Sequence, residues 1–399
     1  MKILMLAPQP FFEERGTPIA VRLAAEALAG QGHEVDLLTF HVGQDVAMPG
    51  VRHHRIAAPP GIRRVPIGFS PAKLVCDLWM FFAAARLLLR QRHDVVHAVE
   101  EAVFLAWPLA TMQRARLVYD ADSILSEQIA DKWPKARMLI RLLASLERAA
   151  FRRSDLTLAV CPAIQTAARG VAPVDRVHLL TDVAFEDPDS AEATEDIRVL
   201  ADGRPLALYV GNLEAYQGVA LLIEALALVD PDRRPMLVII GGNPQAIADH
   251  ATLADRLGVA AEVRLLGARP LRHLAHYLAQ ADILCSPRIQ GRNTPMKIFS
   301  YMASTRAILA TRIESHSQVL DDACAWLALP TAQGLADGLD RLGQDAMLRN
   351  DLGRVAAYRA RTEFSHDAFV ERLRLAYATL QSRVPPAPRP LVEKPAEGR

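Results

Sequence analysis

The sequence predicts an α/β protein built from two doubly wound domains, and three features of the chain support this. Short apolar segments alternate with helical segments along most of the 399 residues, which is typical of parallel sheets covered by helices. Each half contains a Thr-Pro pair that begins a helix, at residues 17–18 and 294–295. Between the halves, the acidic segment 185–203 lacks apolar periodicity and is expected to be a linker.

The first half begins as doubly wound domains do. Strands are expected at residues 2–6, 35–40, 94–98, 116–119 and 155–160. Gly16 ends the loop after the first strand, and Thr17 then begins a helix that stops at Gly30. We therefore predict a first domain over residues 1–184, with ligands at the carboxyl ends of its strands.

The second half repeats the pattern. Strands are expected at residues 205–211, 236–240, 263–266, 283–286 and 307–311, and helices at 219–229, 245–257, 271–279 and 294–303. They predict a second domain over residues 204–362. An amphipathic helix is expected at 363–383, and the proline-rich tail 384–399 is predicted to be disordered.

The composition is that of a globular protein, with 51% apolar and 23% charged residues. A net charge of +1 gives no reason to expect a nucleic-acid partner. The four cysteines stand far apart without metal-ligand spacing, which indicates reduced thiols in a cytoplasmic protein. The apolar region 74–89 is interrupted by Asp77 and Arg86 and is too short to span a bilayer.

Polar residues gather where two strands of the first domain end. They are His97, Glu100 and Glu101 after one strand, and Asp120, Asp122, Ser123 and Glu127 after the next. Such residues are candidates for a site at the sheet edge. His97 could contact an acceptor together with Glu101, or it could be a core histidine whose hydrogen bonds are satisfied.

Residues 288–311 (RIQGRNTPMKIFSYMASTRAILAT) carry the most informative motif. Thr294 is suited to the N-cap of a helix and Pro295 to its first position, which places Lys297 third. The helix dipole disfavours a cation there unless an anion binds at the same end. Lys297 and the preceding Arg292 therefore indicate an anion site; the alternative is that both are solvated surface charges.

This segment resembles the second-domain signature of retaining GT-B glycosyltransferases of the family-4 type, as a divergent subgroup. The run 294–297 matches their TP(L/M)K motif, 300–304 the helix that follows, and 307–311 the next strand. The resemblance extends over about residues 1–380. It implies two Rossmann-like domains facing a central cleft, a C-terminal helix that crosses back to the first domain, a nucleotide-sugar site in the second domain and an acceptor site in the first.

Several positions depart from the family pattern. In the loop 211–218, Asn212 and Gln217 stand where an arginine and a lysine usually bind the diphosphate. The two usual glutamates fall on Arg292 and Ser300, and the usual histidine of the first domain appears as Asp122. We hypothesise that the positive charge has moved to the facing loop and helix start, and that Ser300 contacts the ribose.

The resemblance and these departures give a set of expected site residues. Catalytic roles are expected for Asp122, His97 and Lys297, and donor binding for Gly16, Gly211, Asn212, Gln217, Gly242, Gly267, Arg292, Asn293, Thr294, Pro295, Met296, Lys297 and Ser300. No metal is expected, because no DxD motif lies in a suitable place. No cofactor is expected beyond a nucleotide-sugar substrate, with UDP- or GDP-sugar favoured.

Two basic segments, 74–92 and 132–153, have the composition of amphipathic surfaces. With their apolar and aromatic residues, such helices can lie on anionic membranes. The alternative is that they pack on the sheet and present their basic residues to water. A peripheral contact with the inner face of the membrane is thus one of two interpretations.

The predicted function is the transfer of a hexose from a nucleotide sugar to an acceptor hydroxyl with retention. A lipid-linked or polysaccharide acceptor of the cell envelope is expected. The first alternative is a GT-B-like sugar-nucleotide binding or scaffold protein that lacks catalysis, because the substituted positions belong to the working part of the family motif. A GT-B epimerase or phosphorylase is a further alternative.

Overall fold

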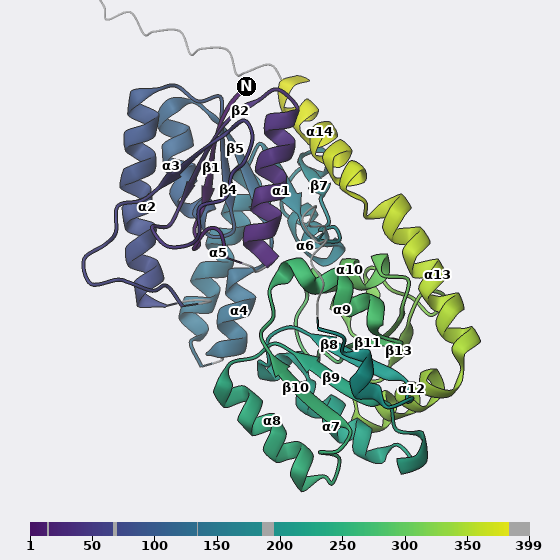
Figure 1. Ribbon diagram of the computed structural model, residues 1–399. Coiled ribbons are helices and arrows are strands. Elements are labelled where there is room, and N and C mark those ends of the chain that lie inside the picture. Colours follow the sequence, from purple (N-terminus) through teal and green to yellow (C-terminus); the bar gives the residue numbers. More distant parts are fainter. Residues whose placement is uncertain (14–15, 67–69, 134, 186–194, 383–399) are drawn as a thin grey trace, which may run out of the picture.

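The computed structural model describes residues 1–13, 16–66, 70–133, 135–185 and 195–382 (Figure 1). Most of the expected linker and the whole of the expected tail 384–399 lie outside these residues. The described residues form two α/β domains, each with a parallel sheet covered by helices on both faces. The predicted fold class is confirmed.

The first domain contains a seven-stranded parallel sheet in the order β3-β2-β1-β4-β5-β6-β7. Its strands are β1 Lys2–Ala7, β2 Glu34–Thr39, β3 Val51–Arg55, β4 Val95–Val99, β5 Arg116–Ala121, β6 Leu156–Ala159 and β7 Val177–Leu179. Its helices are α1 Gly16–Gly30, α2 Pro71–Arg90, α3 Ala102–Gln113, α4 Leu125–Lys132, α5 Arg137–Arg153, α6 Pro162–Arg169 and the 3-10 helix η1 Val174–Arg176.

Apolar side chains on both faces of this sheet explain its two helical layers. Helices α2, α3, α5 and α6 bury their apolar sides on one face. Helix α1 packs on the other face together with α14 His366–Ser382, the last helix of the described chain. Strands buried on both faces read as continuous apolar runs, as β1 (KILMLA) does.

The second domain contains a six-stranded parallel sheet in the order β10-β9-β8-β11-β12-β13. Its strands are β8 Leu206–Val210, β9 Met236–Ile240, β10 Val263–Gly267, β11 Ile283–Ser286, β12 Ala307–Thr311 and β13 Trp326–Ala328. Its α-helices are α7 Val219–Leu228, α8 Pro244–Arg256, α9 Leu274–Gln280, α10 Lys297–Ala303, α11 Glu314–Ser317, α12 Ala332–Gln344 and α13 Ala346–Glu363. Its 3-10 helices are η2 Arg198–Ala201, η3 Ala215–Gln217, η4 Pro231–Arg233 and η5 Leu271–His273.

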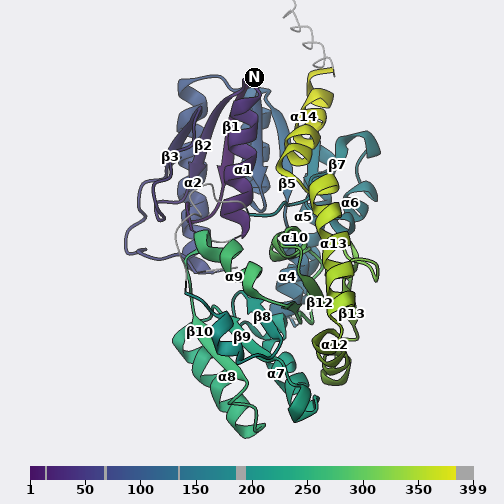
Figure 2. The ribbon, with the colours of Figure 1, turned by 45° about the vertical axis from the view of Figure 1, so that its right-hand side comes forward.

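The C-terminal helix returns to the first domain, as the resemblance implies. Figures 1 and 2 show α13 leaving the second domain and α14 running along the first. Phe369, Leu373 and Tyr377 of α14 join the apolar core on the α1 face of the first sheet. The Gln31 side chain adds a hydrogen bond of 3.0 Å to the carbonyl of Val370. The first domain is therefore completed by the end of the described chain.

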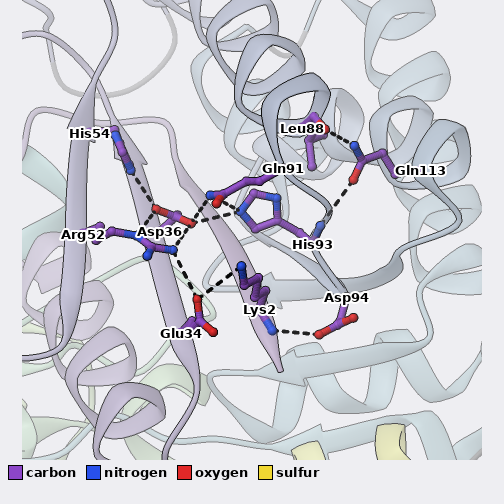
Figure 3. Close-up of polar contacts among 10 residues, drawn as sticks. All are labelled: Lys2, Glu34, Asp36, Arg52, His54, Leu88, Gln91, His93, Asp94 and Gln113. Atoms are coloured by element: carbon purple, nitrogen blue, oxygen red, sulfur yellow. Dashed lines mark hydrogen bonds and ion pairs between the residues drawn. The ribbon is translucent and has the colours of Figure 1, made fainter.

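A buried carboxylate organises the amino-terminal edge of the first sheet, away from the carboxyl ends where ligands bind (Figure 3). Asp36 is 1% exposed and accepts two bonds from Arg52, at 2.8 and 2.9 Å. It also accepts bonds from Gln91 and contacts the Nε2 atoms of His54 and His93 at 2.8 and 3.0 Å. Burial alone raises the pKa of Asp36, but the bonds from His93, Arg52 and His54 outweigh it and hold the pKa well below its usual range.

Candidate active site

The second domain presents a glycine-lined backbone surface at the carboxyl edge of its sheet. Gly211 follows β8 with φ of 151°, and a Cβ there would lie 2.9 Å from Tyr209 Oη and 3.1 Å from Lys297 Nζ. A Cβ at Gly241 would lie 2.0 Å from the Gly211 carbonyl oxygen, so the two backbones are in close approach. Of the predicted donor-binding glycines, Gly242 and Gly267 also have positive φ and follow or end the neighbouring strands β9 and β10.

Lys297 reaches this surface from the facing helix. Its ammonium donates to the Val210 carbonyl and to Gln217 Oε1, both at 3.3 Å, and lies 4.0 Å above the Tyr209 ring. Burial lowers the pKa of Lys297 to about 7, and the charge of Arg288 adds to this effect. The ammonium thus stands in the loop from which the usual cations are missing, and Gln217 is its acceptor.

The helix start differs from the one predicted. Helix α10 begins at Lys297 with Met296 at its N-cap position, so the expected cap at Thr294 is wrong. Thr294 Oγ1 is buried and has no hydrogen-bond partner among the described residues, and Pro295 lies in the turn before the helix. Because Lys297 is the first helical residue, its side chain can reach back to the β8 loop.

Arg288 is a cation of the site that the sequence did not reveal. It follows β11, is only 8% exposed, and lies 5.3 Å over the ring of Tyr216. Its guanidinium donates to the carbonyls of Gln290 and Asn293 and to Asn293 Oδ1, at 2.6, 3.1 and 3.1 Å. No carboxylate pairs with it in the described part of the chain. Arg288 therefore shapes the loop before α10 and keeps its positive charge uncompensated.

Arg292 is placed differently from Lys297. Its exposed guanidinium pairs with Glu127 of α4 in the first domain and, at 3.2 Å, with Glu314 of α11. Its carbonyl accepts a bond of 2.6 Å from Gln318. Both charges that face Arg292 are negative, so its predicted contact with a diphosphate requires these ion pairs to open. In the structure the side chain connects the two domains.

Other predicted donor residues have structural contacts. Asn212 accepts a bond from the Glu214 amide at 3.3 Å through its side chain and one from Tyr209 Oη at 2.6 Å through its carbonyl. Ser300 is 5% exposed, and its hydroxyl accepts the Phe185 amide at 3.1 Å. This hydroxyl holds the chain where it enters the linker, so the expected contact with a ribose would have to displace or share that bond.

The two predicted helix starts meet across the domains. A Cβ at Gly16, the first residue of α1, would lie 4.0 Å from the Cβ of Met296. Nearby, the Ala163 amide of α6 donates a bond of 2.7 Å to the Gln318 side chain of the second domain. The carboxyl edges of the two sheets therefore face each other, as the doubly wound pattern predicts.

The first domain contributes carboxylates to this edge. Asp120 and Asp122 stand at the end of β5, Glu100 follows β4, and Asp182 follows β7. The Glu100 amide donates to the Asp120 carbonyl at 2.9 Å, and Ser123 Oγ donates to Glu100 at 3.3 Å. Burial, with repulsion from neighbouring carboxylates, raises the pKa of both Glu100 and Asp182 to about 7.

Asp122, predicted as catalytic, lies within this group. Burial raises its pKa well above the usual range, and the charges of Asp120, Glu100 and Asp182 raise it further. Glu100 adopts a positive φ of 50°, which is uncommon for a residue other than glycine. Within the described residues, no set of His, Cys, Asp and Glu side chains is arranged to hold a metal ion.

Two models of protein families match this chain. The model described as "Glycosyl transferases group 1" matches residues 204–345, and the model described as "Glycosyltransferase Family 4" matches residues 15–181. Together they account for most of both domains.

The chain belongs to the GT-B glycosyltransferases of the family-4 type.

Curated relatives of this glycosyltransferase-family chain are distant. An α-D-kanosaminyltransferase of Streptomyces kanamyceticus is 25% identical over 236 residues, which cover 57% of this chain. A D-inositol 3-phosphate glycosyltransferase of Kribbella flavida is 25% identical over 393 residues, covering 86% of each protein. The chain spans 61% of the kanosaminyltransferase and 49% of a D-inositol 3-phosphate glycosyltransferase of Corynebacterium diphtheriae.

Solved structures share the GT-B fold of this family member. Sucrose-phosphate synthase of Thermosynechococcus elongatus superposes with a TM-score of 0.80 at 20% identity, covering 95% of this chain and 99% of that one. HepE of Anabaena in complex with UDP-glucose has a TM-score of 0.72 at 17% identity, with 95% and 100% coverage. WaaG, a glycosyltransferase involved in lipopolysaccharide biosynthesis, has a TM-score of 0.70 at 18% identity, with 94% and 99% coverage.

In this GT-B chain, His97 is a core residue rather than a surface one. It has no exposed area, and its two ring nitrogens lie 2.7 Å from Tyr377 Oη and 3.2 Å from Asp120 Oδ2. Its expected partner Glu101 pairs instead with Lys73 of α2. The structure favours the interpretation of His97 as a satisfied core histidine, one that joins Asp120 at the site to the C-terminal helix.

Proposed function

We propose that this protein is a glycosyltransferase that moves a sugar from a nucleotide-sugar donor to an acceptor hydroxyl. The observation that carries the proposal is the chemistry of the two facing edges, with basic side chains on one and carboxyl side chains on the other. Lys297 and Arg288 supply positive charge on the second domain, and a group of four carboxylates lies on the first. An edge with cations beside exposed backbone suits a diphosphate, and a carboxylate edge suits the hydroxyls of sugars.

The residues of the second domain would hold the leaving nucleotide. The Lys297 ammonium and the Arg288 guanidinium would balance the charge that develops on the diphosphate as the sugar leaves. Glycine at 211 and 241 permits the close approach of the two backbone segments beside the Lys297 ammonium, because a Cβ at either position would meet protein atoms. The predicted roles of Asn212 and Gln217 as donors to the diphosphate belong to the same proposal. Arg292 would join them only after release from Glu127 and Glu314.

The carboxylates of the first domain would hold the reacting hydroxyls. Burial raises the pKa of Glu100 to about 7, so this group can exchange a proton near neutral pH, and burial raises the pKa of Asp122 as well. We propose that Asp122 orients the acceptor or the hydroxyls of the transferred sugar. Retention of the anomeric configuration and transfer of a hexose, both implied by the family resemblance, complete the proposal.

UDP-glucose is the first donor to test, because HepE, a structural neighbour, is described in complex with UDP-glucose. We also propose a cell-envelope glycan or lipid-linked acceptor, since WaaG is involved in lipopolysaccharide biosynthesis. A cytoplasmic site of action is supported by four free and buried cysteines. In the described chain, no helix is long and apolar enough to cross a membrane.

The experiment is a thermal-shift screen with UDP-, GDP-, ADP- and dTDP-sugars, followed by assays of released nucleoside diphosphate. A donor that binds the folded state raises the melting temperature. Turnover with at least one donor and acceptor mixture is expected. The absence of any shift across the donor panel would contradict the proposal.

The alternative is a GT-B-like protein that binds a sugar nucleotide without transferring its sugar. The two substituted loop positions, Asn212 and Gln217, and the ion pairs of Arg292 favour it. A thermal shift without turnover on acceptor mixtures would support this alternative over the transferase.

A further inference from the structure

Helices α2 and α5 expose several large apolar side chains to solvent. On α2 these are Leu74, Leu78, Phe82 and Leu89, with exposed fractions of 51, 49, 61 and 78%. On α5 they are Met138, Leu139, Leu142 and Leu146, at 86, 40, 58 and 38%. Helix α3 packs between these two helices and exposes Met112 at 56%. We call these nine side chains the outer apolar face.

The spacing of these residues shows that the face is continuous along each helix. Met138, Leu142 and Leu146 repeat every four residues, as do Leu74, Leu78 and Phe82, so each set forms one stripe. Both helices bury a different side on the sheet, through Met80 and Ala84 in α2 and through Ala150 and Phe151 in α5. The stripes are therefore additional to the sides that form the core.

The charge on these helices is of one sign. A row of exposed arginines lies beside the α5 stripe, at Arg137, Arg141, Arg148 and Arg152, and exposed arginines of α2 are Arg86 and Arg90. The acidic residues of α2, α3 and α5 are Asp77 and Glu147, which are 8 and 3% exposed. Glu147 accepts bonds from the amide and hydroxyl of Ser126. The outward side of the three helices is therefore apolar and cationic.

We propose that the outer apolar face binds the surface of an anionic lipid bilayer. An interfacial bilayer accepts apolar side chains at the depth of its headgroups and supplies negative charge for the flanking arginines. A second copy of the chain fits less well, because it would bring arginine rows together, and the carboxylates of α2, α3 and α5, Asp77 and Glu147, are buried and do not face them. An anionic lipid surface therefore fits the outer apolar face better than a second copy of the chain does.

The contact would also place the cleft near the membrane. Helices that follow parallel strands begin at the carboxyl edge of the sheet, and α5 is preceded by α4, whose Glu127 contacts Arg292. The stripe of α5 lies in its first ten residues, on the cleft side. A lipid-linked acceptor would then meet the site at the bilayer surface, a consequence that rests on the proposed function; the bilayer contact itself does not.

The test is flotation of the full chain with vesicles at low salt. Binding is expected to vesicles of phosphatidylcholine with about one third phosphatidylglycerol and not to phosphatidylcholine alone. The double variant Arg137→Gln/Arg141→Gln should weaken binding by about 25-fold, since each basic residue near an anionic surface contributes about fivefold. Met138→Ser/Leu142→Ser should reduce binding at least tenfold.

Matched control variants come from helix α13 of the second domain. Met347→Ser/Tyr358→Ser removes apolar side chains of 75 and 62% exposure, and Arg354→Gln removes an exposed charge. These controls should bind vesicles like the parent protein. Equal loss in the controls, equal binding to neutral vesicles or no flotation at low salt would each overturn the proposal. So would a dimer in solution that Met138→Ser/Leu142→Ser dissociates.

Two further measurements keep the result unambiguous. Melting temperatures of all variants should stay close to the parent value, because every substituted side chain is exposed. Calorimetric binding of UDP-glucose without vesicles should be the same in the face variants and the parent. If the face variants lose vesicle binding but still bind UDP-glucose like the parent, the result supports the outer apolar face as the lipid-binding surface. If the parent protein itself does not bind UDP-glucose, the result contradicts only the proposed function.

Discussion

At the scale of single residues, Lys297 and Arg288 supply positive charge to the candidate site from different elements of the second domain. Lys297 begins a helix and reaches back to the β8 loop, whereas Arg288 follows a strand and is fixed by the loop that it supports. Burial lowers the pKa of both side chains, and the charge of Arg288 lowers the pKa of Lys297 further. Two nearby, poorly hydrated cations without a carboxylate are favourable only when an anion joins them.

Replacement of the lysine tests this arrangement. Lys297→Met is expected to weaken UDP-glucose binding by roughly 10- to 100-fold, because a hydrogen bond to a charged group contributes about 1.5–3 kcal/mol. Isothermal calorimetry measures the change. Arg354→Met, which removes an exposed charge from α13, serves as the control and should leave the affinity unaltered. An affinity for Lys297→Met equal to that of the control would exclude the lysine from the donor site.

The pH dependence of donor binding follows from the same group. The pKa of Lys297 is about 7 in the free protein, and a bound diphosphate raises it by favouring the charged form. Affinity should therefore be highest below pH 7 and fall as pH rises, by up to about tenfold per unit, until the raised pKa is reached. Calorimetry from pH 6 to 9 tests this, and the slope should disappear in Lys297→Met.

A comparison of Arg288 and Arg292 variants tests which arginine supplies the second cation of the donor site beside Lys297. Arg288→Gln is expected to reduce donor affinity at least tenfold, whereas Arg292→Gln should change it less than threefold, since Glu127 and Glu314 already neutralise that guanidinium. The predicted contact of Arg292 with the diphosphate would be supported by the reverse order. Circular dichroism of both variants checks that neither substitution in the loop before α10 unfolds the domain.

The site residues that the sequence predicts and those that it does not predict differ in whether local or tertiary contacts position them. The predicted roles of Lys297 and Asp122 come from local features: a motif at a helix start for Lys297, and for Asp122 the end of a strand, at the place of the family's usual histidine. Arg288 was missed, since its role depends on bonds to Asn293 across a turn. Asp182 was missed because β7, only three residues long, gives no strand signal. Local sequence patterns indicate where a residue lies in the fold, whereas tertiary contacts determine which residues it contacts.

At the scale of elements, the sequence predicts the buried strands and the edge strand β10, but not the edge strands β3, β7 and β13. Apolar runs marked β1, β9 and β12 because both faces of each are covered. Strand β3 (VRHHR) lies at the sheet edge and is polar, so it was interpreted only as part of a basic segment. The expected start of α10 was wrong because Thr294 lies in a buried loop and not at the helix end.

Helix α14 makes one polar contact to the core that can be tested alone. Tyr377→Phe removes the 2.7 Å bond to His97 without changing the packing of the ring. The variant is expected to lose about 1–2 kcal/mol of unfolding free energy, since it leaves a buried nitrogen unpaired. Urea denaturation measures this loss. Tyr358→Phe, on an exposed position of α13, should unfold like the parent, and an equal loss there would contradict the assignment.

At the scale of the whole molecule, the two edges of the first sheet are built for different purposes. The carboxyl edge holds carboxylates that repel one another, whereas the amino edge holds the buried Asp36, which is hydrogen-bonded to Arg52 and His54 (Figure 3). Repulsion among the carboxylates at the carboxyl edge lowers the stability of the folded protein, and a bound substrate can offset that loss. Asp36 at the amino edge is hydrogen-bonded and contributes stability with or without substrate.

The amino edge predicts how the protein responds to acid. Because the folded pKa of Asp36 is depressed, its contribution is present above the unfolded pKa of about 4 and is lost as pH falls below that value. Asp36→Asn should cost about 1.5–3 kcal/mol near neutral pH, because the hydrogen bonds from Arg52 and the neighbouring histidines lose their charged acceptor. It should also flatten the dependence of stability on pH between 4 and 2. An unchanged acid-unfolding profile would disprove this.

The packing of α14 against the first domain has a consequence for truncated forms of the protein. Residues 1–184 hold every strand of the first sheet, yet Phe369, Leu373 and Tyr377 cover part of its α1 face. A fragment cut at the linker would expose that apolar surface to water and should aggregate. Supplying residues 366–382 through a short engineered connection would restore the cover, so the N-terminal lobe is a discontinuous folding unit.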